Sequence, residues 1–146
     1  MNATNLYHWH QNSKTSITYK FFSENSAMLS MVSRNEWGAR ASKLMEKFNG
    51  EIPFVIIHHS YIPSACYTED ACMQAMQRMQ DMHQLTNKWN DIGYSFVIGG
   101  DGKIYHGRGF NVIGAHSPRY NDKSIGICLI GDWTSNYNIF FIPNIF

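Results

Sequence analysis

The chain has 146 residues, of which 44% are apolar and 16% are charged, and this composition is typical of one compact globular domain. The net charge is +1 at pH 7 and the basic residues are scattered, so neither nucleic acid nor an anionic membrane surface is indicated as a partner. No apolar stretch has the length of a membrane span, and the first thirty residues show no hydrophobic core of a signal peptide.

The two ends of the chain differ in composition from the sequence between them. Residues 1–31 are rich in Asn, Ser, Thr and Lys and lack a steady periodicity, which predicts a loosely ordered N-terminal extension. Residues 136–146 are apolar and uncharged, a composition typical of aggregation-prone segments. We therefore expect one folded domain over residues 32–135, followed by an atypical apolar tail.

Three segments in the first two-thirds of this domain predict strands and a helix. Residues 53–57 form a short apolar run rich in β-branched side chains, which favours a strand buried on both faces, with His58 and His59 at its C-terminal end. Residues 68–87 contain no Pro or Gly and carry an apolar stripe at helical spacing, and Thr68 is suited to cap this helix. The pattern predicts a helix packed on a sheet.

The second half of the domain predicts a hairpin and one further strand. Residues 92–99 and 103–109 are strand-like runs on either side of a Gly-Gly-Asp-Gly turn. Tyr94 and Arg108 are equally far from Asp101, so we expect them to lie close together at the open end of the hairpin. Residues 124–131 predict another buried strand, and the fold class is therefore α/β.

The three cysteines leave the disulfide pattern open. An odd number cannot pair completely, and no CxxC spacing indicates a zinc knuckle. Cys66 and Cys72 close a short loop, which is compatible with a disulfide but equally with two thiols. Cys128 lies in an apolar run, which favours a buried structural thiol.

Five motifs occur in one order along residues 33–133, and together they resemble the peptidoglycan recognition proteins, most of all the amidase-type members of insects. They are SRNEWGAR (33–40), VIIHHS (55–60), WNDIGYSF (89–96), GRGFNVIGAH (107–116) and NDKSIGI (121–127). The resemblance implies a central mixed β-sheet flanked by helices. It also implies a groove that holds muropeptides and, in amidase members, a zinc ion that cleaves the bond between N-acetylmuramic acid and L-alanine.

The resemblance also implies roles for individual residues. His58 matches the first zinc ligand, and Tyr94 matches the catalytic tyrosine that stabilises the developing oxyanion. The positions that match peptidoglycan-binding residues are His59, His83, Trp89, Arg108 and His116.

Other positions bear on the preferred ligand and on the cysteines. An Arg at position 108 goes with diaminopimelate-type peptidoglycan in this family, because a guanidinium can pair with its additional carboxylate. Lys88 departs from the pattern, which has glycine before the tryptophan. Cys66 and Cys72 match the short disulfide of the family.

The family's remaining zinc ligands, a second His and a Cys, lie beyond the point where the resemblance stops near Trp133. Zinc sites use three or four protein ligands, so we expect that this chain does not bind zinc stably. We considered His59, His116 and Cys128 as replacements, but nothing in their spacing places them around His58. Without the family, these histidines would be interpreted as ordinary core or edge residues.

Three hypotheses follow from this combination. The chain recognises peptidoglycan in innate immunity without cleaving it, or it is a zinc-dependent N-acetylmuramoyl-L-alanine amidase, or it is an inactive truncated isoform without the C-terminal helices and zinc-ligand loop of the family. The family implies secretion, whereas the missing signal peptide leaves a cytoplasmic location as the alternative.

Overall fold

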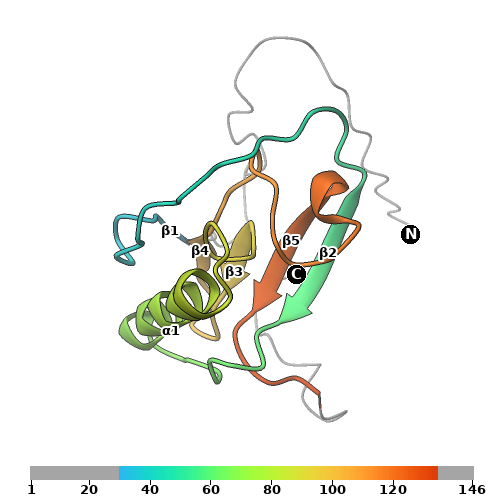
Figure 1. Cartoon of the computed structure of the whole chain (residues 1–146). Helices are drawn as coiled ribbons and strands as arrows, with labels where there is room; N and C mark the ends of the chain where they lie inside the picture. The colour runs from blue at the N-terminus through green and yellow to red at the C-terminus, as the bar shows by residue number, and fades with distance from the viewer. Residues whose placement is uncertain (1–29, 135–146) are drawn as a thin grey trace, which may run out of the picture.

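The computed structural model describes residues 30–134, which form a mixed sheet with one long helix (Figure 1). The predicted N-terminal extension, except for its last two residues, and the predicted apolar tail lie outside the described residues. None of the helices within residues 30–134 has both the length and the apolar composition needed to cross a membrane.

The sheet has five strands in the order β1-β4-β3-β5-β2. β3 and β4 are antiparallel, and every other neighbouring pair is parallel. This arrangement confirms the predicted central mixed sheet of an α/β fold. The strands are β1 (Met31–Val32), β2 (Phe54–His59), β3 (Phe96–Ile98), β4 (Ile104–His106) and β5 (Ser124–Leu129).

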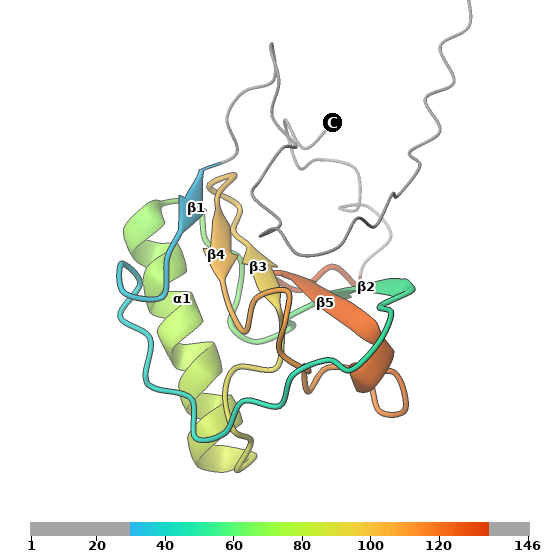
Figure 2. The same cartoon turned by 90° about the horizontal axis from the view of Figure 1, so that it is seen from above.

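The predicted helix corresponds to α1 (Glu69–Asp81), which continues as a π-helical turn, η1 (Met82–Thr86). Thr68 caps α1, since its hydroxyl oxygen accepts a hydrogen bond from the Ala71 backbone N–H at 3.4 Å. Figure 2 shows α1 beside the part of the sheet that contains β1 and β4, and away from β2. The buried side of α1 packs against Val97 and Tyr105 from the hairpin strands, and this contact forms the core.

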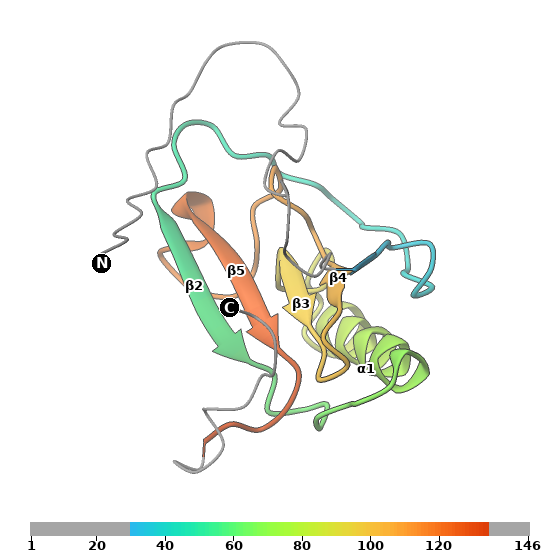
Figure 3. The same ribbon diagram turned by 180° about the vertical axis from the view of Figure 1, so that it is seen from behind.

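One face of β2 is exposed, which contradicts the prediction of a strand buried on both faces. Val55 and Ile57 are 62% and 68% exposed. β2 lies at the edge of the sheet, and no described element covers the face opposite α1 at this edge (Figure 3). A uniformly apolar strand carries no alternation that would show which of its faces is covered.

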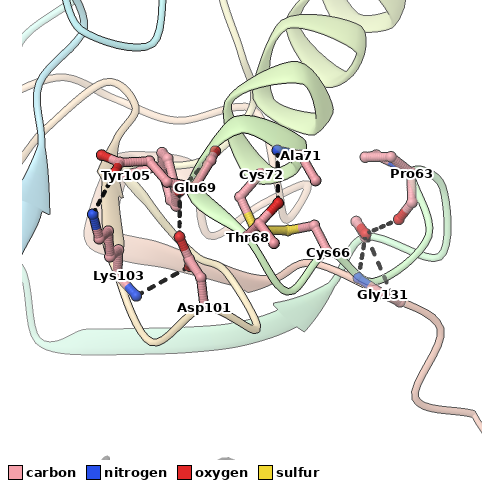
Figure 4. The surroundings of a disulfide bond; sticks show 11 residues. Pro63, Cys66, Thr68, Glu69, Ala71, Cys72, Asp101, Lys103, Tyr105 and Gly131 are labelled. Carbon is pink, nitrogen blue, oxygen red and sulfur yellow. Dashed lines mark hydrogen bonds and ion pairs between the residues drawn. A yellow bond between two sulfur atoms is a disulfide. The ribbon is translucent and has the colours of Figure 1, made fainter.

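The predicted hairpin is present, with the turn at residues 99–102. Gly102 adopts a positive φ of 79°, and Asp101 accepts hydrogen bonds from the Lys103 backbone N–H and the Tyr105 hydroxyl (Figure 4). The pairing of β1 with β4 was not predicted, because two residues are too few to show any periodicity.

Cys66 and Cys72 form the disulfide that the family resemblance implied, with their Cα atoms 5.2 Å apart (Figure 4). The bond ties the loop after β2 to the first turn of α1. Cys128 is a buried free thiol, as predicted.

Replacing both Cys66 and Cys72 with Ser should lower the free energy of unfolding by about 2 kcal/mol, because the disulfide closes a short loop in the unfolded chain. The measurement is urea unfolding of the variant beside the unmodified chain with and without reductant. The reduced chain should match the double variant, and an unchanged midpoint in both would contradict the prediction.

Candidate functional site

Three aromatic side chains from distant segments meet on the α1 side of the sheet. His58 is the penultimate residue of β2, Tyr94 precedes β3, and His116 lies in the loop before β5. The ring centroid of His58 is 5.4 Å from that of Tyr94 and 5.0 Å from that of His116. Nε2 of His58 and Nδ1 of His116 are 2.9 Å apart, which is hydrogen-bond distance.

The position of His116 corrects the sequence interpretation, in which nothing placed His116 or Cys128 near His58. Cys128 is the register partner of His58 in the parallel β2–β5 pair, so the two side chains share a face. Its thiol donates a hydrogen bond to the Leu129 carbonyl at 3.6 Å. His59 alternates to the opposite face, where its Nδ1 accepts the Trp133 backbone N–H at 3.2 Å.

Burial keeps the groups in this cluster uncharged near neutral pH. It raises the pKa of Cys128 to about 12 and that of Tyr94 above its ordinary value. Burial also lowers the pKa of His58, with a further contribution from His59, and lowers that of His116, with a further contribution from His58. The site therefore presents neutral imidazoles beside a neutral phenol.

A second aromatic group adjoins the first through Tyr94. The rings of His83 and Trp89 lie 4.6 Å apart, and His83 is 5.8 Å from Tyr94. Nδ1 of His83 accepts the Gly93 backbone N–H at 3.0 Å, which links η1 to the loop before β3. Burial, followed by the charge of Arg108, lowers the pKa of His83 to about 4.

Arg108 is held by backbone carbonyls. Its Nε donates to the Ile92 carbonyl and its first terminal nitrogen to the Ile113 carbonyl, both at 2.7 Å, and its second terminal nitrogen donates to the Asp91 carbonyl at 3.4 Å. As predicted, Arg108 lies beside Tyr94, since its backbone N–H donates to the Tyr94 carbonyl. Among residues 30–134, no carboxylate lies within ion-pair distance of its guanidinium.

A buried charge network fixes the loop that carries Tyr94. Asp91 is 3% exposed and pairs with Arg34 at 3.0 Å. Its Oδ1 accepts hydrogen bonds from the Gln80 side chain at 2.6 Å and the Ile92 backbone N–H at 2.7 Å. Sequence reasoning assigned no role to these residues, although Arg34 and Asp91 lie inside two of the five motifs.

The backbone conformation at Lys88 explains why the family pattern has glycine at this position. Lys88 adopts a φ of 62°, in the left-handed region that glycine occupies most readily. A glycine in the family pattern fits this backbone, and the lysine adopts the same turn while its ammonium donates to the Leu85 carbonyl at 2.6 Å. The turn still places the following Trp89 against His83.

The described residues do not supply a zinc site. A catalytic zinc ion takes three protein ligands and one open position. Within residues 30–134, no three His, Cys, Asp or Glu side chains converge as metal ligands. Nε2 of His58 is engaged with His116, and Cys128 is turned toward the core.

The comparisons with known proteins agree with the fold and with the family that the sequence motifs resemble. The family described as N-acetylmuramoyl-L-alanine amidase (Amidase_2) matches residues 48–139. Peptidoglycan-recognition protein LB of Drosophila melanogaster is 66% identical over 103 residues, which are 70% of this chain and 44% of that protein. The N-acetylmuramoyl-L-alanine amidase of Mus musculus is 44% identical over 84 residues, which are 57% of this chain and 16% of that protein.

The solved structures to which the chain is similar include peptidoglycan-recognition proteins as well. A tyrosine-to-phenylalanine variant of Drosophila PGRP-LB in complex with tracheal cytotoxin superposes with a TM-score of 0.70 at 63% identity, covering 73% of this chain and 63% of that one. The chain belongs to the N-acetylmuramoyl-L-alanine amidase family and is similar to its peptidoglycan-recognition proteins. It spans less than half the length of the LB protein that it matches.

Replacing Asp91 with Ala should lower the free energy of unfolding by about 3 kcal/mol, because Arg34 and Gln80 lose a buried partner. The exposed pair of Asp81 with Arg40 provides the matched control, and Asp81→Ala should cost less than about 1 kcal/mol. Chemical unfolding measures both variants. Equal losses would contradict a special role for the buried carboxylate.

Acidification should destabilise the fold through His83. Its folded pKa of about 4 lies below the ordinary 6.5, so the unfolded chain binds more protons between these values. The contribution of His83 to the free energy of unfolding is complete above pH 6.5 and is lost as the pH falls toward 4. At pH 5 the free energy of unfolding should be lower by about 2 kcal/mol. Urea unfolding at pH 7.5 and pH 5 measures the loss, which should shrink in His83→Gln. The same loss in both proteins would rule out His83 as its source.

Proposed function

We propose that this chain recognises bacterial peptidoglycan, in innate immunity, without cleaving it. The observation that carries the proposal is the continuous group formed by Trp89, His83, Tyr94, His58 and His116, in which each ring contacts the next. Within this group His83 is buried, and the other four rings are partly exposed. Partly exposed aromatic rings with polar atoms at their edges suit sugars and peptides. The complex of the related Drosophila protein with tracheal cytotoxin, a muropeptide, supports the ligand class.

The geometry of Arg108 supports peptidoglycan of the diaminopimelate type as the preferred ligand. A guanidinium has five N–H donors, and three of them are engaged by carbonyls. The two terminal nitrogens therefore each keep one N–H that makes no hydrogen bond to the described residues, and a carboxylate could accept from both. The three carbonyls hold the guanidinium in place without neutralising its charge. A ligand carboxylate would supply a directly paired counter-charge, in addition to the more distant Asp91 and Glu46.

The proposal that the chain does not cleave peptidoglycan rests on which metal-binding side chains the described residues contain. His58 and Tyr94 match catalytic positions of the family, and the described residues offer no set of three metal ligands around them. The disulfide between Cys66 and Cys72 favours an oxidising compartment, which supports secretion as the location where the chain meets bacterial cell walls.

Retention of the purified chain on insoluble diaminopimelate-type peptidoglycan tests recognition, with cellulose as the control polymer. We expect retention on peptidoglycan alone, and no retention above cellulose would remove the proposal. Release of stem peptides from muropeptides, followed with and without added Zn²⁺, tests the amidase alternative. Release that depends on zinc and is abolished in His58→Ala would establish the enzyme instead of the binding module.

Arg108→Lys should weaken binding to diaminopimelate-type peptidoglycan about tenfold or more, because an ammonium keeps the charge but cannot form the paired hydrogen bonds. Binding to lysine-type peptidoglycan should change little. The matched control is Arg40→Lys, which alters a surface arginine beside α1. Binding isotherms on both polymers measure the effect. An equal loss on both polymers would mean that Arg108 supports the fold and does not select the ligand.

A further inference from the structure

His58, His116 and Ser124 form a chain of hydrogen bonds that ends on a backbone carbonyl. Nε2 of His58 lies 2.9 Å from Nδ1 of His116, and Nε2 of His116 lies 3.5 Å from the Ser124 hydroxyl oxygen. The Ser124 hydroxyl donates to the Tyr120 carbonyl at 2.5 Å. Each group in the series therefore contacts the next through one polar atom.

The carbonyl at the end of the chain sets the direction of every bond. A carbonyl oxygen can only accept, so the Ser124 proton is committed to Tyr120 and the Ser124 oxygen can only accept from His116. His116 then carries its proton on Nε2 and leaves a lone pair on Nδ1. That lone pair can only accept, so the proton between the two rings belongs to Nε2 of His58.

The ring of His116 is held in this position by two glycines. A Cβ atom on Gly126 would lie 2.5 Å from Cγ and Cδ2 of His116, and a Cβ atom on Gly114 would lie 2.5 Å from Cδ2. The ring thus occupies space that exists only because both neighbours lack side chains. The His116 and Ser117 backbone N–H groups also donate to the Asn121 side chain, at 2.9 and 2.8 Å, which fixes the loop that carries the ring.

We infer that His116 is a positioning residue that holds His58 as the Nε2–H tautomer and so leaves Nδ1 of His58 as a fixed lone pair. Nδ1 of His58 makes no hydrogen bond to the described residues, and the His58 side chain is only partly buried. It can therefore meet an electron-pair acceptor from outside the chain, such as an N–H group of a bound peptide. This role differs from direct contact of His116 with the ligand.

Nuclear magnetic resonance of the full, ligand-free chain labelled with ¹⁵N tests the inference. We expect a through-hydrogen-bond coupling between Nε2 of His58 and Nδ1 of His116, with the proton bonded to His58 and a pyridine-type shift for Nδ1 of His58. A proton bonded to Nδ1 of His116, or no coupling between the rings, would overturn the inference.

Two substitutions separate positioning from packing. His116→Ala should abolish the protected Nε2–H signal of His58, whereas His116→Asn should restore it, because the Asn side-chain oxygen can accept in place of Nδ1. Backbone amide signals of α1 and β5 report whether each variant is folded. A protected signal that persists in folded His116→Ala would contradict the positioning role.

The inference rests on the proposed function only for the identity of the ligand that meets Nδ1. Because the coupling is measured without ligand, a chain that shows it but is not retained on peptidoglycan refutes recognition alone. A chain that is retained on peptidoglycan but lacks the coupling refutes the positioning role alone.

Discussion

The parallel pairing of β5 with both β2 and β3 is the constraint on which the site depends. Cys128 in β5 is the register partner of His58 on one side and of Val97 on the other. This double register places the end of β2 beside the loop that leads into β3, where Tyr94 lies.

The loops before β3 and β5 then need their own anchors, since neither belongs to the sheet. Backbone carbonyls of the first loop accept from Arg108, and its Asp91 carboxylate accepts from Gln80 and pairs with Arg34. In the second loop, the Ile113 carbonyl also accepts a hydrogen bond from the Arg108 guanidinium. One half-buried guanidinium therefore joins both loops, and it does so through neutral partners that leave its charge available to a ligand.

Much of the fold could be predicted from local patterns, and the site only in part. The helix cap at Thr68, the hairpin turn and the strand of residues 124–129 follow from side-chain chemistry within a few residues. The contact of His58 with His116 spans 58 positions and depends on sheet register, which no local pattern encodes. The anchoring of Arg108 was equally hidden, because backbone carbonyls carry no sequence signature.

The family resemblance implies two properties of His58 together, namely a lone pair directed into a site and a metal ion that the lone pair binds. The two properties have different structural requirements. Fixing the tautomer requires only His116, Ser124 and a carbonyl, all of which the described residues contain. Holding a metal requires further ligands, and no such group of three exists within residues 30–134. A fixed neutral imidazole accepts hydrogen bonds whether or not a metal is present, so His58 has a defined chemical role that depends only on described residues.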